Sequence, residues 1–281
     1  MKLKTKWLWG ILPILILLVV AGFASAESST SARSADTQSV LQKVISSKKL
    51  TIGMVLSIPP QEYQGKHGEP VGMDVDWANL LAQSLGAKLK IVNVPEATRI
   101  AEIQAGKVDV LFSSPAITLE RAQVVAFTNP YLAAGTVLVT TTKSGVKSAA
   151  DMAGKKVGVL SGTFYDPIAA KYLPKAKVQH LQSTTDEQVA LKNGQIAAYF
   201  RDSNTAVAVA AKDSSLKIIT GNFGGVEYDG FAVQQGDQTW LNYLNTFIFT
   251  MQSDGTSVQL FKKWFGSPPL YSPILTKQLG S

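Results

Sequence analysis

Cysteine is absent from this chain of 281 residues, and histidine occurs only twice, at His67 and His180. The absence of cysteine excludes disulfides, thiolate metal sites and a lipidated cysteine anchor, and it fits an exported protein that does not rely on disulfides. Two histidines argue against a histidine-based metal site. A Gly-x-x-x-x-Gly-Lys phosphate loop is also lacking, as is a Lys/Arg stripe interleaved with aromatic residues. We therefore expect no metal, no cofactor and no nucleic-acid partner.

The N-terminus has the layout of a secretory signal peptide. Three lysines in the first six residues precede an apolar run over 7–23, and Ala24-Ser25-Ala26 follows it. An Ala-x-Ala site after a short apolar run is typical of cleavage, so we predict a signal peptide over 1–26, cleaved after Ala26, and a periplasmic protein. Cleavage would lower the formal net charge from +7 to +4. The competing interpretation is an uncleaved anchor, because the run approaches the ~20 residues that span a bilayer.

The rest of the chain is long and apolar enough for two lobes. Residues are 46% hydrophobic and 17% charged, which suffices for a sizeable core. Residues 27–40 are rich in Ser, Thr and Ala without apolar periodicity, which predicts a flexible leader. Strand patterns at 50–56 and 89–94 then alternate with helical ones, and this alternation predicts a mostly parallel sheet covered by helices.

The stretch 108–131 carries the first candidate site. Residues 108–112 read as a buried strand that ends at Ser113-Ser114-Pro115, and Thr118 can cap a short helix with Arg121 in its first turn. A cation is disfavoured there by ~0.3–1 kcal/mol because the helix N-terminus is positive. Either Glu120 pairs with Arg121 on the surface, or a bound carboxylate meets Arg121 and Ser114.

Arg99 repeats this arrangement at the start of the helix predicted over 97–105. A salt bridge to Glu96 or Glu102 would explain it without a ligand.

A second series of strands and helices follows residue 137. The strand 157–160 turns through Ser161-Gly162-Thr163 into a helix, which is either an ordinary turn or a carboxylate site made of free backbone N–H groups. Residues 184–187 read as a capping box. Asp202 follows the strand 196–200 and can be the N-cap of the next helix.

Several motifs in order resemble the family 3 extracellular solute-binding proteins, the polar-amino-acid receptors of ABC importers. The match runs from about residue 41 to about residue 266 and rests on Ser-Ser-x-x-Ile-Thr-x-x-Arg (113–121), Phe-Thr-x-Pro-Tyr (127–131), Gly-Met-Asp-Val-Asp (72–76), Ala-Gly-Lys-Val-Asp (105–109), Gly-Lys-Lys-Val-Gly-Val-Leu-Ser-Gly-Thr (154–163) and Lys-Lys-Trp-Phe-Gly (262–266).

The resemblance implies an α/β, two-lobed type II periplasmic-binding-protein fold, each lobe a mostly parallel sheet flanked by helices, joined by two hinge strands. Lobe 1 would comprise 41–137 and 229–281, and lobe 2 would comprise 138–228. A monomer would close on an amino acid and deliver it to an ABC permease in the membrane.

The resemblance also implies the ligand-binding residues. Arg121 would hold the ligand carboxylate, Asp202 its ammonium group, and Arg99 the side-chain carboxylate found in the acidic-amino-acid branch. Two arginines would therefore favour an acidic ligand such as aspartate or glutamate. The complete set of expected ligand-binding residues is Arg121, Asp202, Ser114, Ala116, Arg99, Thr163, Phe164 and Ile58.

The sequence departs from the family pattern at a few of these positions. Ile58 stands where many relatives place a stacking aromatic ring, and Phe164 stands where a hydroxyl is common. No dedicated acid is evident beyond Asp202, so we expect no enzyme. The alternatives are a periplasmic enzyme resembling cyclohexadienyl dehydratases, which needs a positioned general acid, and a ligand-binding partner of a membrane sensor.

Overall fold

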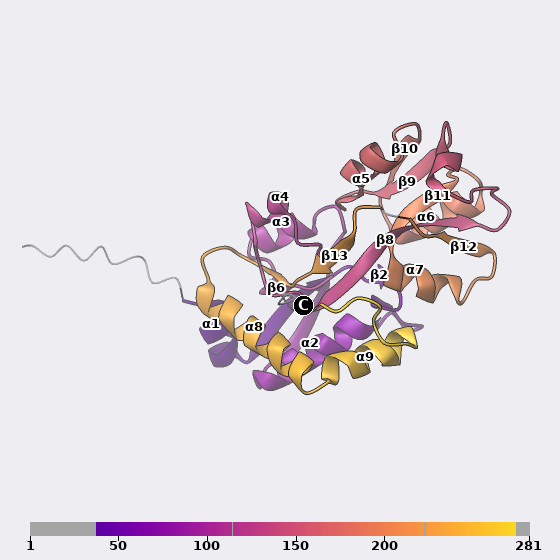
Figure 1. Ribbon diagram of the computed structural model, residues 1–281. Helices are drawn as coiled ribbons and strands as arrows, with labels where there is room; N and C mark the ends of the chain where they lie inside the picture. Colours follow the sequence, from indigo (N-terminus) through magenta and orange to yellow (C-terminus); the bar gives the residue numbers. More distant parts are fainter. Residues whose placement is uncertain (1–37, 114, 222, 274–281) are drawn as a thin grey trace, which may run out of the picture. The chain divides into compact units, whose positions relative to one another are not determined.

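Two β-sheets organise the part of the chain that the computed structural model describes, residues 38–113, 115–221 and 223–273 (Figure 1). The predicted signal peptide with its cleavage site, residues 27–37 of the predicted leader, Ser114 and residues 274–281 lie outside this part. None of the helices within it combines the length and apolarity that a membrane crossing requires. Its helices are α1 Val40–Ser47, α2 Met73–Ser84, α3 Arg99–Gln104, α4 Leu119–Ala122, α5 Tyr165–Tyr172, α6 Thr184–Lys192, α7 Ser203–Ala210, α8 Gln238–Ser253, α9 Thr256–Phe265 and the 3₁₀-helix η1 Ala149–Met152.

The first sheet joins strands from both ends of the described chain. Its order is β5-β1-β6-β14-β7, in which β1 runs parallel to β5 and β6, whereas β14 is antiparallel to both of its neighbours. Strand β14 comes late in the sequence, yet it lies inside the sheet between two earlier strands, β6 and β7. The bounds are β1 Lys49–Met54, β5 Lys88–Asn93, β6 Val110–Leu111, β7 Ala126–Phe127 and β14 Ala232–Val233.

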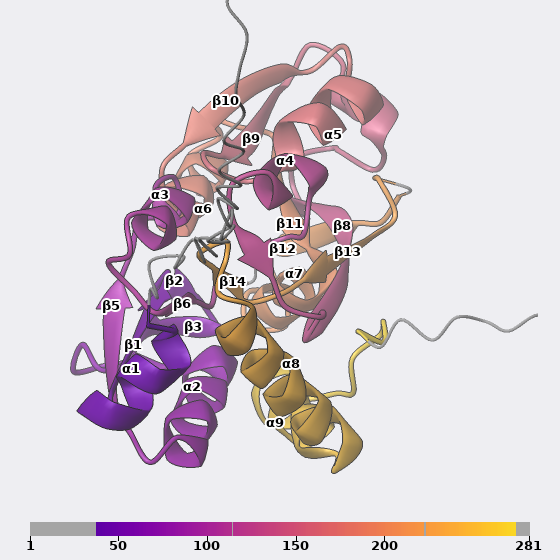
Figure 2. The same cartoon turned by 90° about the vertical axis from the view of Figure 1, so that its left-hand side faces the viewer.

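Helices α2, α8 and α9 cover this sheet with a large aromatic core. Trp77 of α2 and Trp240 of α8 are 1% and 0% exposed, and Phe247 and Phe261 belong to the same cluster. The three helices lie side by side in Figure 2. The indole N–H of Trp240 donates to the carbonyl of Asp109 at 2.9 Å, so the late helix is also bonded to the strand region. These aromatic side chains form part of the core of lobe 1.

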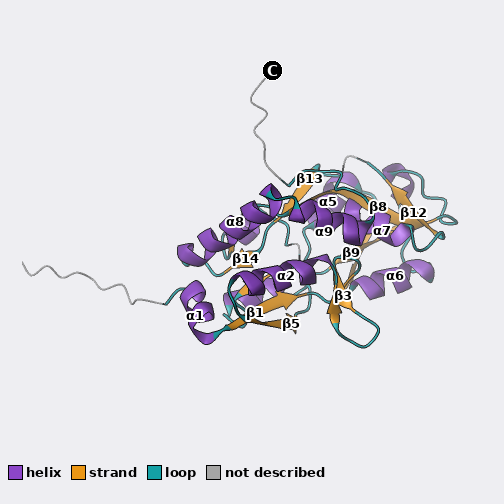
Figure 3. Cartoon of the chain, turned by 90° about the horizontal axis from the view of Figure 1, so that it is seen from below, coloured by secondary structure: helices purple, strands orange, loops and turns teal. Residues whose placement is uncertain are grey.

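The second sheet has the order β10-β9-β11-β8-β12, and only its first three strands in this order pair in parallel. Strands β9, β10 and β11 run parallel, and β8 is antiparallel to β11 and β12. Helix α5 contributes to the hydrophobic cluster on one face of this sheet, and helices α6 and α7 contribute to the cluster on the other face. Helices therefore cover both faces (Figure 3). The bounds are β8 Leu132–Thr141, β9 Lys156–Leu160, β10 Lys177–Leu181, β11 Ala198–Asp202 and β12 Leu216–Ile219.

Two antiparallel strands join the sheets. Strand β8 contributes Leu132 to the first core and Leu138 to the second. Strand β13 (Val226–Asp229) pairs with the first part of β8, from Leu132 to Gly135, before the chain enters β14. We call the part built on the first sheet lobe 1 and the part built on the second sheet lobe 2. The two-lobed α/β fold with two connecting strands is as predicted, and the predicted residue boundaries of the lobes stay predictions.

Some local expectations were wrong. The capping box predicted at 184–187 is absent: Ser183 is the N-cap of α6 and its hydroxyl accepts from the N–H of Asp186, while Glu187 is buried. A third, small sheet of β2 Ser57–Ile58, β3 Glu62–Gln64 and β4 Pro70–Val71 was not expected, because its strands are too short to show alternation.

Candidate functional site

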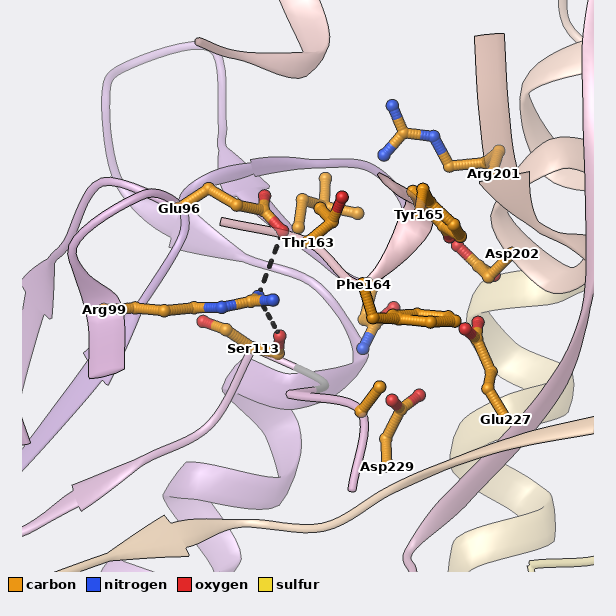
Figure 4. A pocket seen from close by; sticks show the side chains of 13 residues that line it. Glu96, Arg99, Ser113, Thr163, Phe164, Tyr165, Arg201, Asp202, Glu227 and Asp229 are labelled. Carbon is orange, nitrogen blue, oxygen red and sulfur yellow. Dashed lines mark hydrogen bonds and ion pairs between the residues drawn. The ribbon is translucent and has the colours of Figure 1, made fainter. Parts of the chain in front are cut away.

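A cavity of about 50 Å³ lies between the two lobes and is lined by both. Parallel strands place their carboxyl ends at one edge of a sheet, and loops from that edge of each sheet supply much of the lining. Strand β13 supplies two acidic side chains, Glu227 and Asp229. The lining residues are Ile58, Gln61, Glu96, Arg99, Ser113, Ala116, Thr163, Phe164, Tyr165, Arg201, Asp202, Glu227 and Asp229, and most of them are labelled in Figure 4.

Arg99 reaches the cavity from the first residue of α3 and is 3% exposed. Its guanidinium pairs with Glu96 at 3.1 Å and donates to the carbonyl of Ser113 at 2.8 Å. Of the two acidic partners suggested by the sequence, the structure places Glu96 on Arg99, while Glu102 pairs with Lys107. The positive charge of Arg99 is thus already balanced by one carboxylate.

Arg121 is not among the residues that line the cavity, and its hydrogen bonds connect the two lobes. Thr118 caps α4 as predicted, with its hydroxyl accepting from the N–H of Arg121 at 3.2 Å. The guanidinium donates to the carbonyl of Ala116 at 2.9 Å and, across the lobes, to that of Gly162 at 2.8 Å. Glu120 forms no ion pair with it among the described residues. Burial lowers the pKa of Arg121 to about 10, with a further contribution from Arg99, so the group is still charged at neutral pH.

The turn after β9 closes tightly against lobe 1. Gly162 has a φ of +82°, and a Cβ added there would lie 2.6 Å from Cα of Ala97. Only glycine therefore fits without displacing backbone. Thr163 follows, and its hydroxyl donates to the carbonyl of Leu160 at 2.6 Å. The ring of Phe164 lies against that of Tyr165, with 4.7 Å between centroids.

Asp202 both caps a helix and lines the cavity. It is the N-cap of α7, where its Oδ1 accepts from the N–H of Thr205 at 2.8 Å. It also lines the cavity. Because a carboxylate has a second oxygen with further acceptor sites, capping leaves Asp202 able to bind an ammonium group.

The remaining expected residues are distributed unevenly. Ile58 and Ala116 line the cavity, at 7% and 4% exposure. Ser114 lies outside the described residues. Sequence reasoning missed Arg201, which lines the cavity and forms a buried ion pair with Glu187 of α6. Burial is the largest influence on the pKa of Arg201 and lowers it, but Glu187 together with Tyr199, Tyr165 and Asp202 raises the pKa above its ordinary value.

The most consequential residues missed are Glu227 and Asp229. Both line the cavity, and the Oε2 atom of Glu227 is buried without a hydrogen-bond partner among the described residues. Burial raises the pKa of both carboxyl groups well above the usual range. Asp229 and Asp202 raise the pKa of Glu227 further, while Arg121 and Arg201 lower it. Asp202 and Asp74 raise the pKa of Asp229 further, while Arg99 and Arg121 lower it. A signal was present, since two acidic residues two positions apart share one face of a strand.

The carboxylates of Asp202, Glu227 and Asp229 therefore form a group that we call the acidic wall. Figure 4 shows them on the side of the cavity opposite to Arg99, with Phe164 between. No Lys or Arg of the described residues forms an ion pair with any of the three. A buried carboxylate that lacks a positive partner is unfavourable, so the acidic wall is suited to receive a cation.

A two-lobed α/β fold with a polar cavity between its lobes defines a ligand-binding protein of the type that closes around its ligand. The sequence profile of the bacterial extracellular solute-binding proteins, family 3, matches residues 50–267. The chain belongs to this family.

Named relatives agree with this assignment. The chain is 28% identical to the L-cystine-binding protein TcyJ of Escherichia coli K12, over 95% of this chain and 98% of that protein. Among solved structures it is similar to a mutant of ArgBP from T. maritima, with 35% identity, a TM-score of 0.75, and coverage of 81% of this chain and 100% of that one. The ancestral amino acid-binding protein AncCDT-1, a precursor of cyclohexadienyl dehydratase, gives 31% identity, a TM-score of 0.75, and coverage of 81% and 100%. Relatives of this chain are thus amino-acid-binding proteins.

Proposed function

We propose that this protein is the amino-acid receptor of an ABC importer and that its ligand is an amino acid with a cationic side chain. The family and its amino-acid-binding relatives support the receptor role. The single observation that carries the choice of ligand is the acidic wall, because three carboxylates without ion-pair partners face one small cavity. An α-ammonium group alone would balance only one of these charges.

The charges of the cavity support a ligand with two positive groups. Of the two arginines that line the cavity, Arg99 is paired with Glu96 and Arg201 with Glu187. Asp202, Glu227 and Asp229 have no ion-pair partner among the described residues. Arg121, which forms no ion pair within the described part of the chain either, lowers the pKa of both Glu227 and Asp229 but is bonded to two carbonyls. We infer that Asp202 receives the α-ammonium group, as the family resemblance implies, and that Glu227 and Asp229 receive the charged end of the side chain.

An acidic ligand, which Arg99 and Arg121 together suggested, has less support. Arg99 is held by a carboxylate and a carbonyl, and Arg121 by two carbonyls. Like charges at a few ångströms repel strongly where water is excluded, so a side-chain carboxylate would be disfavoured next to the acidic wall. The role of Arg121 in holding the α-carboxylate stays a prediction; its buried charge at the lobe boundary is consistent with that role.

The raised pKa values of Glu227 and Asp229 give this proposal a pH dependence. Both groups must be ionised to bind a cation, and burial favours their protonated forms. Binding of a cation therefore releases protons, and its affinity should rise as the pH is raised from 5 towards 8. A neutral amino acid such as glutamine should show a much flatter profile.

A thermal-shift screen of purified protein, unfolded and refolded to remove bound ligand, tests the proposal. Arginine, lysine, ornithine and histidine would be compared with aspartate, glutamate, glutamine and cystine at one concentration. A ligand at a hundred times its Kd stabilises the native state by about 2.7 kcal/mol, or roughly 5–10 °C in a protein of this size. Shifts with basic amino acids alone are expected. Shifts with aspartate or glutamate alone would overturn the cationic ligand and restore the acidic one.

A dehydratase is the second candidate function, and one observation favours it. Glu227 lines the cavity, its Oε2 atom is buried without a hydrogen-bond partner among the described residues, and its pKa is raised, which are properties of a general acid. One of the similar structures is an amino acid-binding precursor of cyclohexadienyl dehydratase. Incubation of purified protein with prephenate or arogenate, followed spectroscopically, decides the matter: turnover that is lost in Glu227→Gln would establish an enzyme.

A further inference from the structure

The positive charge of the described residues is concentrated on lobe 2. Residues 138–228 contain eleven Lys and Arg against seven Asp and Glu, whereas the other described residues contain eleven of each. Three of the seven acidic residues of 138–228 are taken up elsewhere, namely Glu187 in its ion pair with Arg201, and Asp202 and Glu227 in the ligand cavity. The outer surface of lobe 2 is therefore strongly basic.

Four lysines of lobe 2 line one groove of about 810 Å³. They are Lys143, Lys155, Lys156 and Lys192, and the groove is also lined by the hydroxyl-bearing residues Thr141, Thr142, Ser144 and Ser215. No Asp or Glu is among the described residues that line the groove. Only Lys192 forms an ion pair, with Asp213 at 2.9 Å; the other three form none within the described part of the chain.

Sheet topology brings these lysines together at the edge opposite the ligand cavity. The groove lies where β9, β11 and β12 begin and β8 ends, while Thr163 and Asp202 follow or end strands at the other edge. Neighbouring strands are about 4.8 Å apart. Since β9 and β8 flank β11, the segments that carry Lys156 and Lys143 are separated by two such spacings, or roughly 10 Å.

Backbone hydrogen bonds fix the segments that bear the lysines. The N–H of Ala197 donates to the carbonyl of Lys156 at 2.8 Å, and the N–H of Thr142 donates to that of Ser215 at 2.8 Å. The hydroxyl of Ser144 donates to the carbonyl of Thr141 at 2.8 Å and accepts from the hydroxyl of Thr140 at 2.7 Å. The groove is thus a preformed concave surface and not a set of lysines on mobile loops.

We propose that this groove is a second binding site, specific for a phosphate-bearing anion with several negative charges. Like charges held around one hollow repel each other, and a multivalent anion relieves that repulsion while lysine ammonium and hydroxyl groups donate to its oxygens. A concave basic surface also concentrates the positive potential that attracts such an anion. The site is separate from the amino-acid cavity and does not depend on the identity of the amino acid.

Isothermal titration with inorganic tripolyphosphate tests the site. The variant carries Lys155→Gln and Lys156→Gln; the control carries Lys88→Gln and Lys90→Gln, an equal loss of charge on exposed lysines of β5 in lobe 1. We expect the groove variant to lose about tenfold or more in affinity and the control to stay within about twofold. An equal loss in both variants would show a response to net charge alone and would overturn the proposal. The proposal would also be overturned if the wild-type protein bound neither tripolyphosphate nor anionic lipid vesicles.

Sedimentation with vesicles distinguishes the two sources of phosphate. Vesicles with and without anionic phosphatidylglycerol would be compared with soluble tripolyphosphate, using the same variants at about 0.15 M salt. Groove-dependent binding of the anionic vesicles assigns the site to lipid headgroups, and groove-dependent binding of tripolyphosphate alone assigns it to a free anion. Vesicle binding that both double variants lose equally would contradict a site at the groove.

Discussion

Replacing Glu227 by Gln removes one charge of the acidic wall and keeps the shape of the side chain. If Glu227 receives the charged end of a basic amino acid, the variant loses one charge-assisted hydrogen bond, which contributes about 1.5–3 kcal/mol. At about 1.4 kcal/mol per factor of ten, arginine should bind about 10-fold to 150-fold more weakly. The empty protein should become more stable at pH 8, because a buried carboxylate without a partner is removed.

Citrulline makes this prediction specific, because it replaces the guanidinium of arginine by a neutral urea group of nearly the same shape. The ratio of the arginine to the citrulline affinity, measured by isothermal titration, should fall in Glu227→Gln by about the same 10-fold to 150-fold. Glu120→Gln is the matched control, since Glu120 is exposed and does not line the cavity. The control should leave the ratio and the melting temperature unchanged.

If the charge of Glu227 serves binding, the Glu227→Gln variant should bind arginine more weakly and, when empty, should be more stable than wild type. A variant that binds arginine more weakly but melts at a higher temperature when empty would fit the reasoning. If arginine and citrulline weaken equally, Glu227 does not meet the side-chain charge. If the empty variant melts lower than wild type, Glu227 stabilises the fold through contacts that its neutral isostere cannot make. The charge of the acidic wall would then not destabilise the empty protein.

Three further changes test other parts of the structure. Arg99→Ala breaks a buried ion pair and should lower stability by about 3–5 kcal/mol, measured by urea unfolding, whereas Lys107→Ala at an exposed pair should cost less than about 1 kcal/mol. Gly162→Ala should weaken ligand binding and hold the lobes apart in small-angle scattering; Gly154→Ala, which has a φ of +75° but open space around it, should not. Burial raises the pKa of Asp74 from 3.8 to about 7, so its burial reduces wild-type stability as the pH rises from 4 to 8, by roughly 4 kcal/mol at most; Asp74→Asn should remove most of this fall, and an unchanged pH profile would refute it.

Periodicity and capping signals predicted the longer elements well. The strand patterns at 50–56 and 89–94 correspond to β1 and β5, because β-branched and apolar runs are local signals that the packing of this sheet does not override. The cap of α4 by Thr118 was also readable, since the hydroxyl and its N–H partner are three residues apart. The predicted N-cap of α6 was wrong by one residue, because Ser183 and Thr184 are both good caps and only packing chooses between them.

The acidic wall could not be recognised in the same way. Glu227 and Asp229 lie on a four-residue strand whose pairing with β8 spans a sequence separation of more than ninety residues. Arg99 shows the same limit from the other side: the sequence offered Glu96, Glu102 and a ligand as partners, and only the fold excluded Glu102. What a charged residue meets across a cavity is set by topology, which local spacing does not encode.

Strand β14 lies between β6 and β7 inside the first sheet, and this position affects the order in which the chain folds. Apart from β13, which pairs with β8 beside lobe 1, every strand of the second sheet lies between residues 132 and 219, so lobe 2 has its main strands once that stretch is available. Lobe 1 must wait for β14 and for Trp240, and Ser39 and Val40 near its start are bonded to Asp237. Lobe 1 therefore lacks one of its inner strands and part of its core until residues 232–240 are available, and we expect it to complete its fold after lobe 2.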